Sequence, residues 1–442
     1  MKHAVVAAGQ AMIDSADLFR DAGLERGADG LLRLGGVSLE AVLRDVGSPA
    51  YIYNAGTIRD RYGAIEAAFS GTRHRVHYAV KSNGSLAILK ILRDLGAGAD
   101  IVSGGELRRA IRAGFDPDMI VFSGVGKSDA ELETAIECRI GGINIESAEE
   151  LAALERIVDR RAVEAPIRIG IRVNPDVAAD THPYITTGAG GIKFGVPAEQ
   201  VMGLARRIAG NPRLSLVSLA MHLGSQLLDP APFVAGAARL VGLIDDIVAQ
   251  DIRSIEAVDV GGGLGIRYQG ETPLEPRVLA SLLTPVIGGR ALALHLEPGR
   301  FLTGSAGVLL TKVLYRKRSG GKNFVIVDAS MTDLVRPSHY QAYHEITELS
   351  ARGRPLQVVD VVGPVCETGD FLALDRLLPG VEVGESLAIL CAGAYGFVMA
   401  SNYNTRPRAP EVLIDRGRYG VSRVRETVDD LLRGETDNPF HR

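Results

Sequence analysis

The sequence is poor in cysteine, in long apolar runs and in clustered charge, and each shortage excludes a class of protein. Three cysteines, Cys138, Cys366 and Cys391, are too few and too scattered for a disulfide framework or a zinc site, so we expect no metal. No apolar stretch reaches the roughly 18 residues that a membrane-spanning helix needs. The formal net charge is −4 and no Lys/Arg-rich run occurs, which argues against nucleic-acid or membrane-surface partners.

The N-terminal segment is a poor candidate for a signal peptide. Its apolar stretch after Lys2 is broken by Gly9, Gln10 and Asp14, so it lacks a continuous hydrophobic region. Together with the few cysteines, this predicts a cytoplasmic protein in a reducing compartment.

Size and composition indicate a soluble globular protein with more than one domain. The 442 residues are 46% hydrophobic and 23% charged, which is typical of a chain with a sizeable core. A barrel of ordinary size would leave more than about a hundred residues of this chain for a second domain.

Eight short apolar segments, each followed by a stretch of helix length, run from residue 74 to residue 298. Such strands argue for a parallel sheet that is buried on both faces, and eight of them predict a (β/α)8 TIM-type barrel with its active site at the strands' C-terminal ends. The segments are VHYAVK, GADIVS, IVFSG, GINIES, IRIGIRVN, LAMHLGS, AVDVGGG and LALHLEP.

After Leu302 the pattern changes to β-rich segments without regular helices between them. This predicts a C-terminal all-β domain. The early strands LLRL and AYIY should join it, because a barrel is closed by its own eight strands. We expect a barrel over residues 57–305 and a β-rich domain over 306–442 together with 1–56.

Lys81 and His222 stand at the ends of the first and sixth predicted strands. A poorly solvated lysine amine is a good imine former, although a strand-end lysine that only extends to solvent is the alternative. A histidine there could stack on a planar cofactor or transfer protons, and a structural histidine is the alternative.

The seventh and eighth strands end in a glycine run and in the segment LEPGR. Gly261, Gly262 and Gly263 would let backbone N–H groups approach a phosphate, or would only form a tight turn. Glu297 could hold a pyridine nitrogen protonated, with a structural pair between Glu297 and Arg300 as the alternative. Together with Lys81 and His222, these residues point to pyridoxal 5'-phosphate.

Two polar groups fall in the predicted β domain. Cys366 and Glu367 lie in GPVCETGD, where the cysteine could be only a small buried hydrophobe. Arg336, with Tyr340 and Tyr343, lies in VRPSHYQAYHE, and an arginine binds a carboxylate bidentately. Ordinary surface loops are the alternative for both groups.

Residues 30 to 433 resemble the diaminopimelate decarboxylases, fold-type III pyridoxal-phosphate enzymes with an alanine-racemase-like barrel. The ordered motifs that carry the resemblance are YAVKSN, DIVSGGEL, FSGVGKS, NPDVAADTHPYITTG, KFGV, HLGSQ, GGGLGI, EPGRFL, RPSHYQAYH, GPVCETGDFLA and GAYGFVMASNYNTRPR.

The resemblance implies a role for each site residue. Lys81 would form the imine with pyridoxal phosphate, His222 would stack on its ring and Glu297 would pair with the pyridine nitrogen. Substrate carboxylates would meet Arg300, Arg336 and Tyr340, and the distal ammonium would meet Glu367. The phosphate would be held by Ser225, Gly261, Gly262, Gly263, Gly299, Arg300 and Tyr395, of which Tyr395 would also contact substrate.

The resemblance also implies the assembly and the reaction. Cys366 and Glu367 would reach into the neighbouring subunit's site, which implies a homodimer with shared active sites. Cys366 or Lys81 would protonate the α-carbon after CO2 leaves. The expected reaction converts meso-2,6-diaminopimelate to L-lysine, the last step of lysine biosynthesis.

Physical chemistry supports this substrate over simple diamino acids. A distal zwitterion needs a cationic partner, which Arg336 provides, and an anionic partner, which Glu367 provides. An unpaired buried charge would cost several kcal/mol, so this pairing should exclude ornithine and lysine.

Three departures from the family pattern leave alternatives. GAGGIKFG replaces a more polar linker, Cys391-Ala392-Gly393 stands where an aspartate usually precedes GAYG, and MHLG replaces CHIG or CHVG. A sister decarboxylase acting on another or a carrier-linked amino acid is one alternative. A catalytically inactive regulatory homologue is another, although the joint retention of Lys81, His222, Glu297 and Cys366 argues against it.

Overall fold

The computed structural model describes residues 15–161, 165–177 and 193–436, and these divide into two compact units. One unit contains residues 59–266 and 272–302, and the other contains residues 1–58, 267–271 and 303–442. The predicted domain limits at residues 57 and 305 stay predictions. The N-terminal segment that was considered as a signal peptide lies almost wholly outside the described residues. Most of the motif NPDVAADTHPYITTG and most of the linker before KFG also lie outside them.

The first unit is a closed parallel barrel of eight strands, as predicted. The strands pair in the order β9-β11-β12-β13-β5-β6-β7-β8, and β8 pairs with β9 to close the ring. Their bounds are β5 (His74–Ala79), β6 (Gly98–Ile101), β7 (Ile120–Phe122), β8 (Gly142–Ile145), β9 (Ile167–Asn174), β11 (Leu214–Ala220), β12 (Ala257–Asp259) and β13 (Ala293–Leu296). A two-residue strand, β10 (Val196–Pro197), adds to β9.

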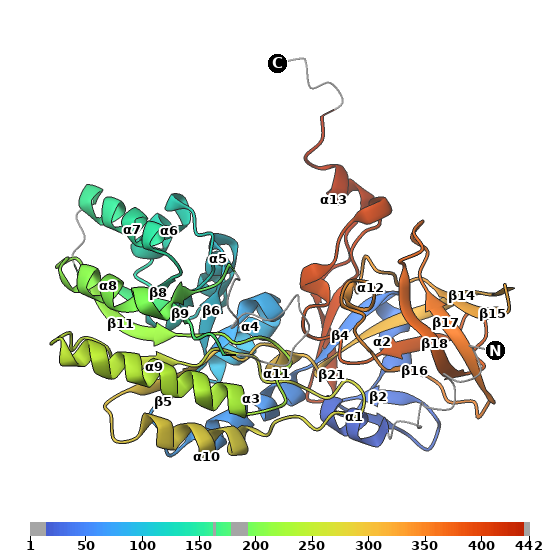
Figure 1. The fold of residues 1–442 in the computed structure, drawn as a ribbon. Helices are drawn as coiled ribbons and strands as arrows, with labels where there is room; N and C mark the ends of the chain where they lie inside the picture. Colours follow the sequence, from blue (N-terminus) through green and yellow to red (C-terminus); the bar gives the residue numbers. More distant parts are fainter. Residues whose placement is uncertain (1–14, 162–164, 178–192, 437–442) are drawn as a thin grey trace. The chain divides into compact units, whose positions relative to one another are not determined.

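Helices alternate with the strands along the chain, the first one preceding β5, and surround them (Figure 1). They are α3 (Ala55–Phe69), α4 (Leu86–Asp94), α5 (Gly104–Ala113), α6 (Asp129–Glu137), α7 (Ala148–Arg160), α8 (Ala198–Ala209), α9 (Ala231–Ala249), α10 (Pro276–Ile287) and the short α11 (Arg300–Thr303), with 3-10 turns η1 (Val80–Ser82) and η2 (Pro117–Met119). Serines start several of them: Ser103 Oγ accepts from the Glu106 amide, and Ser147 Oγ accepts from the Glu150 amide. These serines satisfy orphan amides of the first helical turn, which fixes where strand ends and helix begins.

The second unit is built on a nine-stranded sheet. Its main path runs β18-β17-β15-β14-β4-β20-β21, while β19 pairs with β14 and β16 pairs with β19. The strands are β4 (Ala50–Asn54), β14 (Gly307–Ser319), β15 (Lys322–Val327), β16 (Ile346–Glu348), β17 (Leu356–Val362), β18 (Phe371–Pro379), β19 (Ser386–Ile389), β20 (Glu411–Asp415) and β21 (Arg418–Arg423).

The N-terminal strand AYIY belongs to this sheet, as expected. Strand β4 pairs antiparallel with β14 and parallel with β20. Tyr51 and Tyr53 on it are buried and anchor the core, since their hydroxyls donate to Asp333 O at 2.6 Å and to Glu411 Oε1 at 2.8 Å. The segment LLRL lies in the same unit, in a separate three-stranded sheet of β1 (Leu24–Arg26), β2 (Leu32–Leu34) and β3 (Val37–Ser38).

The second unit also carries helices that the all-β expectation did not include. They are α1 (Ser15–Ala22), α2 (Leu39–Val46), α12 (Arg336–Tyr340) and α13 (Val428–Leu432), with 3-10 turns η4 (Phe397–Met399) and η5 (Tyr403–Thr405). Within the described ranges, no helix has the length and apolar character needed to cross a bilayer.

Candidate active site

Lys81 lies in the 3-10 turn η1, directly after barrel strand β5. Its ammonium pairs with Asp100 on the neighbouring strand β6, with 2.8 Å between Nζ and Oδ2. The Asp100 side chain is fully buried, while the Lys81 side chain is 32% exposed. The lysine thus emerges beside a buried carboxylate rather than in purely apolar surroundings, and it is open enough for a small molecule to reach.

His222 follows strand β11 by two residues and is held by the glycine run. The Gly262 amide donates to His222 Nδ1 at 3.2 Å, so Nδ1 carries no proton. Burial, and then the positive charges of Lys81 and Arg172, lower the pKa of His222 well below its usual value. The ring is therefore neutral at neutral pH, which suits it to stack on a flat ligand.

Three carboxylates meet at the C-terminal end of the barrel. Burial raises the pKa of Asp259 to about 7, and burial together with the charges of Asp100 and Asp259 raises the pKa of Glu297 well above its usual value. Asp259 hydrogen-bonds Glu297 and accepts from the Gly261 amide at 2.7 Å. Glu297 Oε1 is buried and has no hydrogen-bond partner among the described residues. Such an orphaned acceptor is costly unless a donor from a ligand satisfies it.

The glycine run is required by the packing of the strand ends. A Cβ at Gly262 would lie 2.2 Å from Glu297 O, and a Cβ at Gly263 would lie 2.6 Å from Gly224 O. Gly261 and Gly263 also have φ values of +72° and +112°, where a side chain is strained. The run is thus more than a flexible turn, and it brings bare backbone against His222 and Glu297.

Ser225 and Arg300, predicted separately, lie together. Arg300 donates to Ser225 Oγ from Nη2 at 2.8 Å and from Nε at 3.2 Å, and Arg300 is buried. Gly299, just before it, lies against the turn that carries the lysine, since its Cβ would meet Ser82 Cβ at 2.9 Å. The serine hydroxyl and the arginine form a cationic, hydrogen-bonding corner that suits an anion.

Two acidic residues in this site were missed at the level of sequence. Asp100 and Asp259 sit inside short apolar strands, where they read as parts of GADIVS and AVDVGGG. Their position could have indicated the site, because a carboxylate in a strand that is buried on both faces needs an ion-pair or hydrogen-bond partner. A buried ion pair between Arg172 and Glu146, 2.8 Å apart, was missed for the same reason.

Five of the predicted residues belong to the β-rich unit. Arg336 begins α12 and is buried, Tyr340 ends the same helix, and Tyr395 is half-buried with a φ of +56°. Cys366 and Glu367 are exposed on the loop between β17 and β18. The Cys366 amide donates to Asn404 Oδ1 at 3.0 Å, and the loop is tied down by Asp370, which accepts from the Val365 amide at 2.6 Å.

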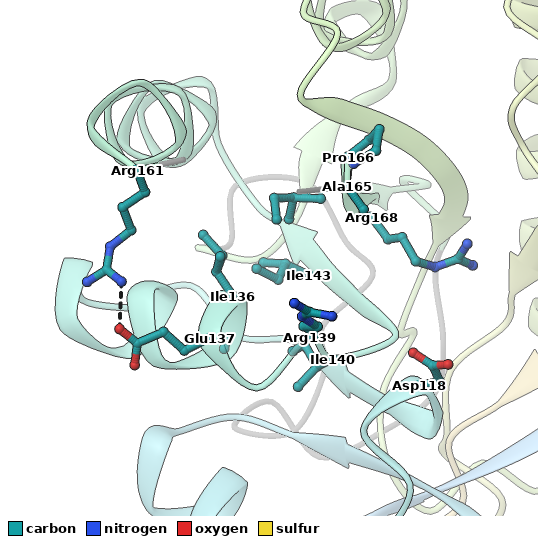
Figure 2. A pocket seen from close by; sticks show the side chains of 12 residues that line it. Asp118, Ile136, Glu137, Arg139, Ile140, Ile143, Arg161, Ala165, Pro166 and Arg168 are labelled. Carbon is teal, nitrogen blue, oxygen red and sulfur yellow. Dashed lines mark hydrogen bonds and ion pairs between the residues drawn. The ribbon is translucent and has the colours of Figure 1, made fainter. Parts of the chain in front are cut away.

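A separate cavity of about 620 Å³ lies elsewhere on the barrel (Figure 2). Its lining comes from the turn before β7, the end of α6 with the start of β8, and the start of β9, including Asp118, Ile140 and Ile167. Figure 2 shows Arg161 reaching across to Glu137, an ion pair of 2.6 Å. Because barrel enzymes place their chemistry at the opposite, C-terminal strand ends, this cavity is not the candidate active site.

Comparison with known proteins shows which family this chain resembles. Residues 55–304 match the family model described as the pyridoxal binding domain of pyridoxal-dependent decarboxylases. A diaminopimelate decarboxylase of Aquifex aeolicus is 44% identical over 92% of this chain and 96% of its own length. A second, from Pseudomonas aeruginosa, is 45% identical over 91% of this chain and 96% of its own length.

The chain belongs to the diaminopimelate decarboxylase family. A crystal structure of diaminopimelate decarboxylase from Helicobacter pylori complexed with L-lysine shares the fold, with a TM-score of 0.86 and 39% identity. That likeness covers 89% of this chain and 98% of the other. The resemblance and the fold class expected from the motifs are thereby confirmed, and pyridoxal phosphate is the cofactor of this enzyme family.

Proposed function

We propose that this protein removes CO2 from meso-2,6-diaminopimelate and yields L-lysine, using pyridoxal 5'-phosphate. The observation that carries the proposal is the buried Glu297 carboxyl, beside Asp259 and close in sequence to Arg300. Its Oε1 has no hydrogen-bond partner in the described part of the chain. A pyridine nitrogen that carries a proton is the donor that such an atom lacks.

The residues at the barrel end fit this cofactor. Lys81 would hold it covalently, the neutral His222 would lie against its ring, and Glu297 would meet its ring nitrogen. Ser225, Arg300 and the amides of the glycine run would hold its phosphate, with Gly299 and the Tyr395 hydroxyl. When bound, pyridoxal phosphate supplies a ring that accepts the electron pair released as the carboxylate leaves.

The protein's own side chains set the charge around the cofactor and hold or donate the protons. The neutral His222 adds no positive charge of its own beside Lys81. Glu297, kept in place by Asp259, holds a proton at the ring nitrogen position. The carbon that loses CO2 gains a proton from the Cys366 thiol or from Lys81. Arg300 serves both the cofactor phosphate and a substrate carboxylate in this proposal.

Specificity would come from the β-rich unit. Arg336 would bind the distal carboxylate of the substrate with Tyr340 and Tyr395, and Glu367 would bind its distal ammonium. The relative from Helicobacter pylori is described in complex with L-lysine, which retains that distal carboxylate and ammonium. A guanidinium fits a carboxylate bidentately, and Lys at the same position would not reproduce this fit.

The substrate assignment is tested by replacing Arg336. Arg336→Ala should raise KM for meso-diaminopimelate far more than it lowers kcat or the melting temperature, and Arg336→Lys should recover little of the loss. An unchanged KM in Arg336→Ala would remove Arg336 from the distal-carboxylate site. Absorbance of the bound cofactor should be the same in all three proteins.

We also propose that the protein acts in the cytoplasm as a homodimer with shared active sites. The exposure of Cys366 and Glu367 supports the dimer, because side chains that complete a neighbour's site must project from their own subunit. None of the three cysteines forms a disulfide in the described part of the chain, which suits a reducing compartment. The β-rich domain of residues 306–442 and 1–56 would supply both substrate contacts and the dimer interface.

A further inference from the structure

We propose that His344 is a positioning residue that sets the orientation of the Arg336 guanidinium toward the distal carboxylate of the substrate. The proposal rests on the proposed function, in which Arg336 binds that carboxylate. His344 follows the substrate-binding helix α12 by four residues and belongs to the same β-rich unit.

The contact between the two side chains is buried. Arg336 Nε lies 3.3 Å from His344 Nε2, and the exposed fractions of the two residues are 6% and 0%. An arginine Nε always carries a hydrogen and never accepts one. The His344 Nε2 atom must therefore be the acceptor, with its lone pair directed at the arginine.

The other ring nitrogen fixes the tautomer. His344 Nδ1 lies 2.8 Å from the carbonyl oxygen of Leu390. A carbonyl oxygen only accepts, so Nδ1 carries the proton and Nε2 does not. The two contacts agree on one neutral tautomer. A protonated ring would instead place an N–H against the arginine.

The sheet holds this acceptor in place. Strand β16 pairs with β19 in the register Ile346 to Ile389, which places Glu345 opposite Leu390 and brings the preceding residue, His344, close to Leu390. The Leu390 amide donates to Glu345 O at 2.8 Å, and Arg376 Nη1 donates to His344 O at 2.7 Å. The imidazole is thus fixed through its own backbone as well as its ring.

Tyr268 provides a common surface for both groups. The Arg336 guanidinium carbon lies 5.0 Å from the centre of the Tyr268 ring, and the His344 ring meets the same ring edge-on at 5.4 Å and 81°. Tyr268 comes from the short segment 267–271, which belongs to the β-rich unit although its neighbours in sequence belong to the barrel. The guanidinium is therefore restrained on its face by Tyr268 and at its Nε edge by His344.

These restraints have a consequence for binding. A guanidinium is planar, and holding its Nε edge directs the edge formed by the two terminal nitrogens, which can bind a carboxylate with two parallel hydrogen bonds. If the acceptor at His344 is lost, the guanidinium can turn toward other partners. Hydrogen bonds to charged groups contribute enough that binding of the distal carboxylate should weaken roughly 10- to 100-fold.

Two substitutions separate positioning from simple packing. In His344→Gln, the side-chain oxygen can take the place of Nε2 and still accept from Arg336. In His344→Asn, the amide can take the place of Nδ1 and donate to Leu390, but nothing reaches Arg336. Both variants keep a polar side chain at the site, and each is studied as the full-length enzyme with bound cofactor.

His344→Asn should raise KM for meso-diaminopimelate about 10-fold or more, with kcat changed by less than about threefold. It should weaken competitive inhibition by L-lysine to a similar degree, while His344→Gln keeps both constants within about threefold of wild type. D-lysine, which lacks the distal carboxylate, should compete equally well in all three proteins. Unchanged inhibition by L-lysine in His344→Asn, or an equal loss for D-lysine, would overturn the proposal.

Further variants cover the case in which His344→Asn does not fold. Tyr268→Leu removes the ring on which both groups rest and should give the same loss for L-lysine and none for D-lysine. In an Arg336→Ala background, His344→Ala should cause no further loss of L-lysine binding, and a further loss would contradict action through Arg336. If the wild-type enzyme releases no CO2 from meso-diaminopimelate, the proposed function is wrong as well. If the wild-type enzyme is active and the variants bind L-lysine as it does, only the inference about His344 is wrong.

Discussion

The replacement of Gly262 by alanine offers a sharp test of how the cofactor site is built. The added Cβ would lie 2.2 Å from the backbone oxygen of Glu297, where ordinary contact begins at 3.4 Å. That oxygen is part of the main chain and cannot rotate away. The end of β12 or β13 must therefore move by about 1 Å, which displaces the carboxyl assigned to the ring nitrogen.

The expected cost follows from overpacking. Inserting a methyl group into a closely packed region costs about 1–3 kcal/mol, and the upper part of that range applies because the clash is with backbone. For a unit of this size, about 3 kcal/mol should lower Tm by roughly 6–12 °C. The Kd for pyridoxal phosphate, measured by absorbance or fluorescence titration, should rise about 10-fold or more, which corresponds to about 1.4 kcal/mol.

Gly203 provides the matched control. It lies in helix α8, is exposed, and a Cβ there would meet nothing within 4 Å. Gly203→Ala should leave cofactor affinity unchanged and should raise stability slightly, by about 0.5–1 kcal/mol, through helix propensity. If Gly262→Ala matched Gly203→Ala in both Tm and cofactor affinity, the account of close strand-end packing would be wrong.

Three further results are expected. Burial raises the pKa of the Asp259 carboxyl to about 7 in the folded protein, whereas its pKa in the unfolded chain is about 4. The protonated carboxyl therefore contributes its full stability below about pH 4, and this contribution is lost as the pH rises through about 7. Thermal melts of cofactor-free protein should thus show a fall in Tm from about pH 4 to 7 that is smaller in Asp259→Asn, and equal slopes would refute this sign. Lys81→Ala should lose the pyridoxyl group that borohydride fixes to the peptide containing residue 81, as mass spectrometry would show, and a retained adduct would exclude Lys81 as the attachment point. Mixing inactive Lys81→Ala and Cys366→Ala chains should restore about a quarter of wild-type activity by subunit exchange, whereas no recovery in proven mixed dimers would place each site within one chain.

Much of the barrel could be predicted from the sequence because parallel strands buried on both faces have a strong signature. The short apolar runs end in residues that also mark the start of the next helix, as Ser103 and Ser147 do. The geometry of a closed parallel barrel then requires strand ends distant in sequence, such as those near Lys81 and Glu297, to meet at one end. The convergence of these residues therefore followed from strand order alone.

The partners that tune those residues could not be predicted in the same way. Asp100 and Asp259 look like interruptions in apolar strands, and only the register of the barrel shows that one pairs with Lys81 and the other with Glu297. Strand β18 has no regular sequence signature, because its buried and exposed residues do not alternate and Asp375 within it has a φ of +47°. Tyr268 gave no signal at all, since its membership of the β-rich unit depends on tertiary contacts across long stretches of chain.

The most direct test of the central claim is CO2 release by purified protein with added pyridoxal phosphate, with meso-diaminopimelate, L-lysine and L-ornithine offered in parallel. Release from meso-diaminopimelate alone, with L-lysine as product, is the result predicted by the proposed pairing of Arg336 and Glu367 with a distal zwitterion. Release from L-lysine or L-ornithine at a comparable rate would contradict that pairing. No release from any of the three, with the cofactor bound at Lys81, would contradict the proposed substrate.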